Sequence, residues 1–342
     1  MQKNTEKLHN ITRILLNPED NYPELTKAID ALYSLFLSTS GLDADDDKNR
    51  EDVYLAKGKA IGATWAAMCV KEILRTKYFI RGLYSAIKAA REKFPDTRIH
   101  ILYAGTGPFA TIAMPMTTVF TSEEISFTLL EINPESIRFL KSNIAAFQAK
   151  DYVNKIVQCD ATTYQADKLN PIHIVLTETM QNALQKEPHV SIALNLVSQM
   201  LPEGILLPQN IKIDAVLMSP SRVMKRLADP CSGRQKYYHP LKTIFELNKS
   251  TFSACAVKNA PDGSCEFPEV IAELPSDIDS EYNDLNLLTY IQVFGDIELT
   301  DYQCSLNLPK RLISLKQSRI PSDKISFQYV ISENPGFRYK FV

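Results

Sequence analysis

Three glutamates stand where side chains commonly take part in chemistry. Glu131 ends an apolar run, 125–130, and a glycine turn with Gly105 and Gly107 ends an earlier apolar run, 99–104. A strand, a glycine turn, a helix and a second strand that ends in an acid form a unit that binds an adenosine ribose beside a helix N-terminus. The glycines let the backbone approach a ligand closely, and the Glu131 carboxylate could accept hydrogen bonds from both ribose hydroxyls. This stretch therefore predicts a site for a nucleoside cofactor.

The other two glutamates flank one loop. Glu178 follows an apolar strand expected at 172–177, on the edge where open α/β sheets bind ligands, and Glu187 comes nine residues later, before a helix expected from Pro188. Taken alone, Glu187 would also fit a helix-start carboxylate that the helix dipole stabilises. An acid at a strand end, as Glu178 is, needs a partner. Because two carboxylates beside a loop can converge on one cation, the pair predicts a site for a cationic group.

The elements that would position these acids divide the chain into three parts. Residues 1–50 are expected to form a helical segment and a polar linker, and 51–207 a Rossmann-like α/β domain. From 208 to 342 strand-like alternation predicts a mostly antiparallel β domain, either a barrel or a sandwich. Helices are expected over much of 51–94, after Gly107, from Pro134 with Asn133 as its cap, from near Pro188 to Leu201, and over 222–227. Strands are expected at 99–104, 125–130, 155–159, 172–177, 204–207, 211–217, 252–257, 287–293, 312–315 and 325–331.

The glycine pattern alone does not separate two cofactors. Residues 105–110 also fit G-x-G-x-x-A, a pattern that binds NAD. A dinucleotide dehydrogenase normally continues with a second α/β half, whereas this chain continues with β strands after Pro208. That difference favours S-adenosylmethionine over NAD.

Composition argues against several other classes of protein. The chain has 342 residues, 45% of them hydrophobic and 23% charged, as in an ordinary soluble protein, and its net charge of −2 indicates no broad basic surface for nucleic acid. No apolar run approaches the ~20 residues that span a membrane, and the N-terminus lacks the apolar core of an export signal. The six cysteines are dispersed without a C-x-x-C pair, which is typical of a reduced, cytoplasmic chain without disulfides or a zinc site.

The loop that carries both glutamates resembles a known family. Met180 follows Glu178 by two residues, and with the spacing to Glu187 it resembles the double-E loop of the protein arginine methyltransferases, which are class I S-adenosylmethionine-dependent methyltransferases. The following residues 191–213, SIALNLVSQMLPEGILLPQNIKI, resemble that family's next helix and its L-x-P-x-G-x-L-x-P strand. The resemblance runs from about Tyr54 through the β domain.

The resemblance implies roles for the residues of the cofactor unit. Gly105 and Gly107 match the glycine motif of the family, and Glu131 matches the acid that binds the ribose. Asp160 and Ala161 stand where the adenine is usually contacted. The resemblance therefore implies S-adenosylmethionine as the cofactor.

Matches and departures also occur outside that unit. Tyr54 matches the first tyrosine of the family's Y-F-x-x-Y segment, and Arg75 matches the arginine that pairs with the methionine carboxylate of the cofactor. Gly58 stands in place of the second tyrosine, Tyr103 in place of an acid before the glycine turn, and no Thr-His-Trp triplet occurs. Residues 219–248 stand where the family carries its dimerisation arm, which implies a possible homodimer; a solvated loop is the alternative.

Together these features predict an S-adenosylmethionine-dependent N-methyltransferase. A guanidinium stays protonated, with a pKa above ~12, so two glutamates could clamp it and leave one nitrogen able to attack a methyl carbon. We expect Glu178 and Glu187 to do this on a guanidino or amino group of a small metabolite or a peptide. Three alternatives stay open: an O- or C-methyltransferase of the same fold, an NAD-dependent oxidoreductase, and a non-catalytic scaffold that binds the cofactor.

Overall fold

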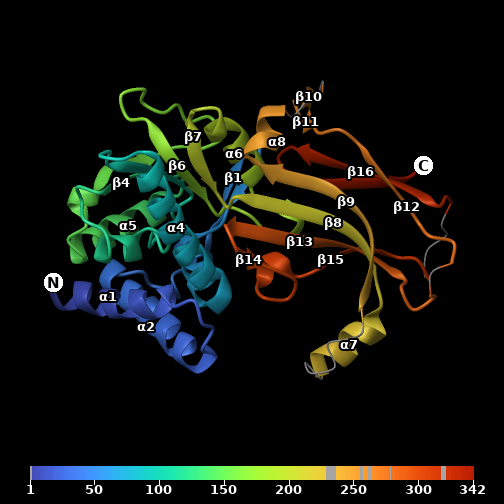
Figure 1. The fold of residues 1–342 in the computed structure, drawn as a ribbon, viewed down its shortest axis with the longest axis horizontal. Coiled ribbons are helices and arrows are strands. Elements are labelled where there is room, and N and C mark those ends of the chain that lie inside the picture. Colours follow the sequence, from blue (N-terminus) through green and yellow to red (C-terminus); the bar gives the residue numbers. More distant parts are fainter. Residues whose placement is uncertain (1, 229–235, 255–256, 261–262, 278, 317–320) are drawn as a thin grey trace.

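The chain folds into an α/β domain and a β domain that lie side by side (Figure 1). The computed structural model describes residues 2–342 except 229–235, 255–256, 261–262, 278 and 317–320. The expected Rossmann-like domain, the mostly antiparallel β domain after it and the helices at the N-terminus are confirmed. None of the described helices combines the length and the apolar character that a membrane span requires.

A five-stranded parallel sheet forms the centre of the α/β domain. Its strands are β3 (Ile99–Ala104), β4 (Ile125–Glu131), β5 (Val153–Gln158), β6 (Ile172–Thr177) and β7 (Met200–Leu207). They lie in the order β5-β4-β3-β6-β7, and every residue of β3, β4 and β6 is buried, as in a parallel sheet with both faces covered. The order reverses between β3 and β6, and ligands bind at the carboxyl ends of the strands at such a point.

Helices surround this sheet. They are α1 (Gln2–Leu16), α2 (Tyr22–Ser40), α3 (Ala63–Met68), α4 (Ile73–Lys93), α5 (Pro134–Ala146) and α6 (His189–Val197). Asn133 caps α5 as expected, because its side-chain oxygen accepts hydrogen bonds from the amides of Glu135 and Ser136. Helix α6 ends before Leu201, which was expected within it; Leu201 instead belongs to β7, because this strand pairs with β6 from Met200 onward.

Two segments expected to be helical are not. After the glycine turn, the chain forms turns over 107–113 and then a 3-10 helix, Met114–Thr118, because Ala110 adopts a positive φ of 46°, outside the range of an α-helix. At the start of 51–94, an antiparallel hairpin of β1 (Val53–Leu55) and β2 (Gly58–Ala60) replaces the expected helix. The extended form of this hairpin is stabilised by a hydrogen bond to a distant loop, at Lys186.

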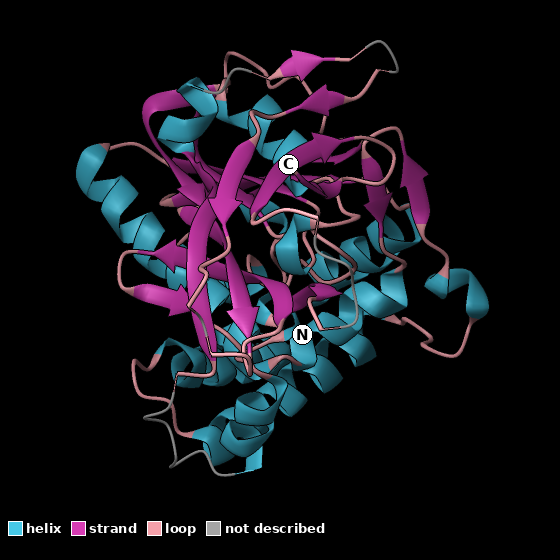
Figure 2. Ribbon diagram, turned by 90° about the vertical axis from the view of Figure 1, so that its right-hand side faces the viewer, coloured by secondary structure: helices cyan, strands magenta, loops and turns pink. Residues whose placement is uncertain are grey.

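The β domain contains two five-stranded antiparallel sheets, which lie in front of the helices in Figure 2. The first sheet comprises β8 (Asn210–Met218), β9 (Tyr238–Asn248), β13 (Asp284–Phe294), β14 (Ile297–Leu299) and β15 (Lys310–Ser314). The second comprises β10 (Lys258–Asn259), β11 (Cys265–Glu266), β12 (Val270–Glu273), β16 (Lys324–Ile331) and β17 (Gly336–Phe341). The ring of Phe245 joins them, with its centroid 5.0 Å from Tyr329 and 5.7 Å from Phe337. The described strands therefore form two open sheets rather than the barrel that was one of the alternatives.

Two further expectations for the β domain need correction. The strand expected at 252–257 is wrong, because residues 252–254 belong to helix α8 (Lys249–Ala254). This helix begins at Lys249 because the Asn248 side chain accepts hydrogen bonds from two amides of its first turn. The dimerisation insertion was expected to span residues 219–248, but its last eleven residues form strand β9 (Tyr238–Asn248), which pairs with β8 along its length. Helix α7 (Pro220–Ala228) projects from the domain (Figure 1).

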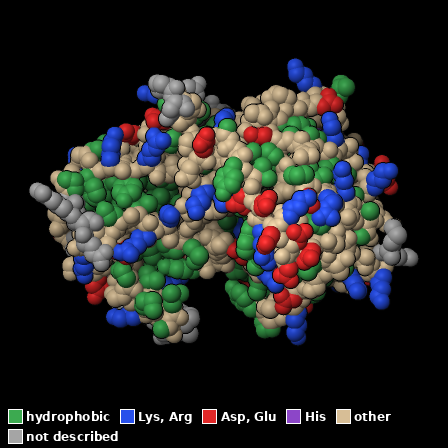
Figure 3. All heavy atoms as spheres, turned by 180° about the vertical axis from the view of Figure 1, so that it is seen from behind, with side chains coloured by type: hydrophobic (Ala, Val, Ile, Leu, Met, Phe, Trp, Pro, Cys, Tyr) green, Lys and Arg blue, Asp and Glu red, His purple; other side chains and the backbone are tan. Residues whose placement is uncertain are grey.

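Helix α4 joins the two halves of the molecule. Gly82 of this helix packs on β13, and a Cβ atom at Gly82 would lie 2.4 Å from the Val293 Cγ1 atom. The loop after β6 also contacts the β domain, so the carboxyl edge of the parallel sheet faces the junction. Seen from behind, the junction is marked by a notch with acidic side chains gathered beside it (Figure 3).

Candidate active site

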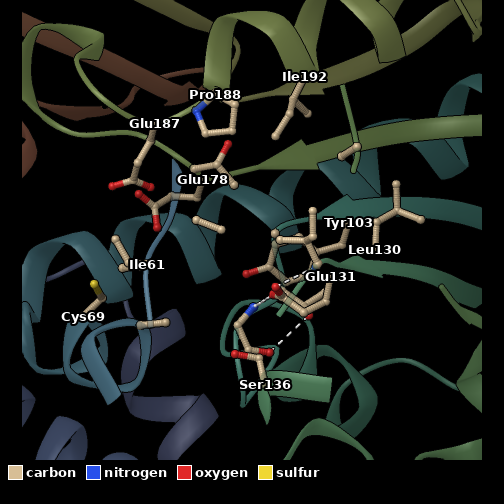
Figure 4. A pocket seen from close by; sticks show the side chains of 18 of the residues that line it. Ile61, Cys69, Tyr103, Leu130, Glu131, Ser136, Glu178, Glu187, Pro188 and Ile192 are labelled. Carbon is tan, nitrogen blue, oxygen red and sulfur yellow. Dashed lines mark hydrogen bonds between the residues drawn. The ribbon is translucent and has the colours of Figure 1, made fainter. Parts of the chain in front are cut away.

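One pocket lies at the carboxyl edge of the parallel sheet. The space inside it is about 1040 Å³, its open mouth included. All of the predicted site residues except Tyr54 line it: Arg75, Gly105, Gly107, Glu131, Asp160, Ala161, Glu178 and Glu187. In Figure 4, Glu178 and Glu187 lie at one end of the pocket and Glu131 lies toward the other. The structure thus brings together residues from five separate segments of the chain.

Tyr54 is the predicted site residue that the structure leaves out of the pocket. Its side chain is 78% exposed, whereas the next residue, Leu55, lines the pocket. Both belong to β1, in which successive side chains point to opposite faces. The strand geometry, which the expected helix would not have produced, therefore directs Tyr54 to solvent.

The glycine turn and Glu131 form one hydrogen-bonded unit. The Glu131 carboxylate accepts hydrogen bonds from the amides of Gly107 at 2.7 Å, Ile132 at 2.8 Å and Asn133 at 2.9 Å. Burial raises the pKa of Glu131, and these amides oppose the rise. A carboxylate has about four acceptor positions, so a ligand hydroxyl that approaches Glu131 must share the carboxylate with the turn.

The glycine turn also requires its glycines. Gly105 has a φ of 74° and Gly107 a φ of 60°, both in the left-handed region. A Cβ atom at Gly105 would lie 2.1 Å from the Thr179 Cγ2 atom, while one at Gly107 would meet only the Ala66 Cβ atom, at 3.4 Å. The close contact at Gly105 thus packs the turn against the segment that follows Glu178.

The end of β5 supplies another polar edge of the pocket. One oxygen of Asp160, Oδ1, accepts a hydrogen bond from the Thr162 amide at 2.8 Å. The carbonyl oxygen of Ala161 accepts one from the Asn195 side chain at 2.9 Å. These bonds orient the chain after the strand, where Asp160 and Ala161 line the pocket.

The loop between Glu178 and Glu187 is held in place by the β domain. The Ala183 amide donates to the Thr289 hydroxyl at 2.9 Å, and the buried Tyr329 hydroxyl donates to the Leu184 carbonyl at 2.8 Å. The Lys186 amide donates to the Pro335 carbonyl at 2.8 Å. Three residues of the loop have a positive φ: Ala183, Leu184 and Lys186. Backbone conformations of this kind are strained in residues other than glycine and persist only where the surrounding structure holds them, so the β domain positions this loop.

Glu178 is engaged by a cation of the chain itself. The Arg75 Nη2 atom lies 2.7 Å and 2.8 Å from the two Glu178 carboxylate oxygens, and its Nη1 atom lies 3.2 Å from Glu72. Burial raises the pKa of Glu178, and the Arg75 guanidinium opposes that rise. Because a guanidinium does not lose its proton, the Arg75 Nη2 group, which contacts both carboxylate oxygens, offsets part of the cost of burying the charge of Glu178. Arg75 therefore lines the pocket and also holds one of the two predicted catalytic glutamates.

Glu187 has a different environment. Glu187 is only 8% exposed, and no described Lys, Arg or His forms an ion pair with its carboxylate. Burial, together with the negative charge of Glu178, raises its pKa to about 7. The two carboxylates face the same space in Figure 4. Glu187 is thus the carboxylate of the pair that can take up or release a proton near neutral pH.

Sequence reasoning missed a lysine of this pocket. Lys59 of β2 lines it, and its Nζ atom lies 2.6 Å from the Asp52 carboxylate. The only signal was the Ala-Lys-Gly-Lys turn composition near Gly58, which the helical periodicity obscured. The thiols of Cys69 and Cys159 also line the pocket. Burial raises the pKa of both to about 11, so neither is a ready nucleophile. Of the other predicted free cysteines, Cys231 and Cys255 lie outside the described residues.

Comparison with known proteins finds similarity among solved structures. No protein-family model matches the chain, and no curated protein matches it. The chain is similar to a solved structure of the Trypanosoma brucei PRMT1 enzyme-prozyme heterotetrameric complex with AdoHcy, with 12% sequence identity and a TM-score of 0.46. The match covers 78% of this chain and 86% of that chain. The functional argument for this chain therefore depends on the pocket itself.

Proposed function

We propose that the chain is an S-adenosylmethionine-dependent methyltransferase that methylates the nitrogen of an amino or guanidino group. The observation that carries this proposal is that Glu131, Glu178 and Glu187 open into one pocket at the switch point of a parallel sheet. The first glutamate suits a ribose, and the other two suit a cationic acceptor. Polar groups for both partners of a methyl transfer thus converge in one cavity.

The residues of the pocket fit the proposed cofactor. Glu131 would accept a hydrogen bond from a ribose hydroxyl, and Asp160 would accept one from the amino group of adenine. Arg75 donates three hydrogen bonds to Glu72 and Glu178. A guanidinium has about five N–H groups, so Arg75 keeps donors for the carboxylate of the methionine moiety.

The two loop glutamates would act on the acceptor. When bound, S-adenosylmethionine supplies a methyl group that passes to a nitrogen lone pair as its bond to sulfur breaks, leaving S-adenosylhomocysteine. Glu178, oriented by Arg75, would bind the acceptor N–H groups, and Glu187 would accept the proton that the methylated nitrogen releases. A pKa near 7 suits that proton transfer, because the base is then available at neutral pH. Both carboxylates disfavour an anionic acceptor atom such as a phenolate oxygen.

One structural feature disfavours the NAD alternative. A dinucleotide pyrophosphate is normally bound at the N-terminus of the α-helix that follows the glycine turn. In this chain turns follow Gly107, and the next helical element is the 3-10 helix Met114–Thr118. The backbone therefore lacks the helix N-terminus that would bind the pyrophosphate.

Two measurements test the proposed function. Calorimetric titration with S-adenosylhomocysteine and, in parallel, with NADH should detect binding of the first and not of the second. Transfer of labelled methyl from S-adenosylmethionine to arginine, agmatine, lysine and cadaverine should then be lost in both Glu178→Gln and Glu187→Gln. The exposed Glu6→Gln is the matched control. Unchanged turnover in both pocket variants, with intact S-adenosylhomocysteine binding, would contradict the assigned roles.

A further inference from the structure

The central strand of the parallel sheet carries a tyrosine that has no role in the proposed function so far. Tyr103 of β3 is in register with Leu129 of β4 and with Leu176 of β6. Two residues after these partners come Glu131 and Glu178. Side chains two residues apart in a strand point to the same face, so Tyr103 and Glu131 share one face of the sheet. Tyr103 therefore lies between the strand that ends in the proposed ribose glutamate and the strand that leads to the proposed acceptor glutamate.

The hydroxyl of Tyr103 has no hydrogen-bond partner among the described residues. Tyr103 is only 3% exposed, and it lines the pocket, where Figure 4 places it beside Glu131. Its hydroxyl is not one of the described side-chain groups that are fully enclosed without a partner, so this oxygen borders open space. Because the pocket is the open space that Tyr103 lines, the hydroxyl is available there to a ligand.

The charges around this hydroxyl favour a cationic ligand group. Burial raises the pKa of Tyr103, the charges of Glu178 and Glu131 raise it further, and the Arg75 guanidinium opposes them less strongly. The phenol therefore stays protonated and neutral at working pH. Since negative charge dominates at its position, a ligand cation is more stable there than a ligand carboxylate. The phenolic oxygen has lone pairs that can accept a hydrogen bond from such a cation.

We propose that the Tyr103 hydroxyl accepts a hydrogen bond from the α-ammonium group of the cofactor's methionine moiety. With the ribose at Glu131 and the methionine carboxylate at Arg75, that ammonium group would lie between them, as Tyr103 does. A carboxylate at position 103 would add a third acid beside Glu131 and Glu178, and like charges that share one site disfavour each other. A phenol binds the ammonium group without that cost. This inference rests on the proposed function for the identity of the cofactor.

Two ligands that differ only by an amino group test this proposal. The unchanged protein and Tyr103→Phe are titrated by calorimetry with S-adenosylhomocysteine and with its analogue that lacks the α-amino group. A hydrogen bond to a charged group changes affinity by roughly tenfold or more. Tyr103→Phe should therefore bind S-adenosylhomocysteine about tenfold less tightly, whereas the analogue should bind equally to both proteins. In urea the variant should unfold no earlier than the unchanged protein, since its missing hydroxyl has no partner among the described residues.

The matched control is Tyr329→Phe, which removes the hydroxyl of another buried tyrosine, one that donates to the Leu184 carbonyl outside the cofactor end of the pocket. It should weaken the fold and keep the affinity for S-adenosylhomocysteine. Unchanged affinity in Tyr103→Phe, or an equal loss for both ligands, would overturn the inference alone. No binding of S-adenosylhomocysteine to the unchanged protein would overturn the proposed function with it. If binding depends on Tyr103 but no methyl is transferred to any amine, the inference holds and the proposed function fails.

Discussion

Replacing Glu187 with glutamine should make the protein more stable at alkaline pH. The pKa of Glu187 rises from an ordinary 4.5 to about 7, because burial and the charge of Glu178 disfavour its ionised form. Between these values the folded state keeps a proton that the unfolded state has lost, so the free energy of unfolding falls as the pH rises. At about 1.36 kcal/mol per pKa unit, the full loss is on the order of 3 kcal/mol above neutral pH.

Urea unfolding of the two proteins at pH 5.5 and pH 8.5 measures this effect. The stability difference between Glu187→Gln and the unchanged protein should grow by about 2 kcal/mol from the lower to the higher pH. The exposed Glu6→Gln should show no such growth. The same titration predicts that methyl transfer rises with pH through about 7, as Glu187 becomes able to accept a proton. A stability difference that is equal at both pH values would refute the reasoning, since the pKa of Glu187 would then be the same in the folded and the unfolded protein.

Three further variants test how the pocket is built. Tyr329→Phe leaves the buried Leu184 carbonyl without its donor, which should lower the free energy of unfolding by about 1–3 kcal/mol. Methyl transfer should fall several-fold, while the affinity for S-adenosylhomocysteine, measured by calorimetry, should stay the same. Gly105→Ala should abolish that affinity because of the overlap with Thr179, and adding Thr179→Ser, which removes the overlapping methyl group, should recover part of it; no recovery would place the cause elsewhere. Tyr54→Ala should leave S-adenosylhomocysteine binding unchanged, since the side chain is 78% exposed, and a large loss of binding would contradict its placement outside the pocket.

Local sequence patterns predicted the parts of the fold that depend on near neighbours. The strands Ile99–Ala104 and Ile172–Thr177 have the expected bounds, because each is a short apolar run closed by a glycine or an acid. The cap of α5 was also predicted, since Asn133 bonds to amides within its own helical turn. The acids Glu131 and Glu178 were placed at the carboxyl edge for the same reason: each ends or follows a parallel strand, and parallel strands end on one side.

The tertiary structure decided what depends on distant segments. The hairpin Val53–Ala60 overrode a helical pattern through a hydrogen bond to the loop before Glu187, and that hairpin turned Tyr54 outward and placed Leu55 in the lining of the pocket. The pairing of Arg75 with Glu178 joins residues 103 positions apart, a distance over which periodicity carries no information. Sequence by itself determined which side chains stand at strand ends and which chemistry they offer. Only the folded chain decided which of them meet, because long-range hydrogen bonds and burial, not local propensity, set those contacts.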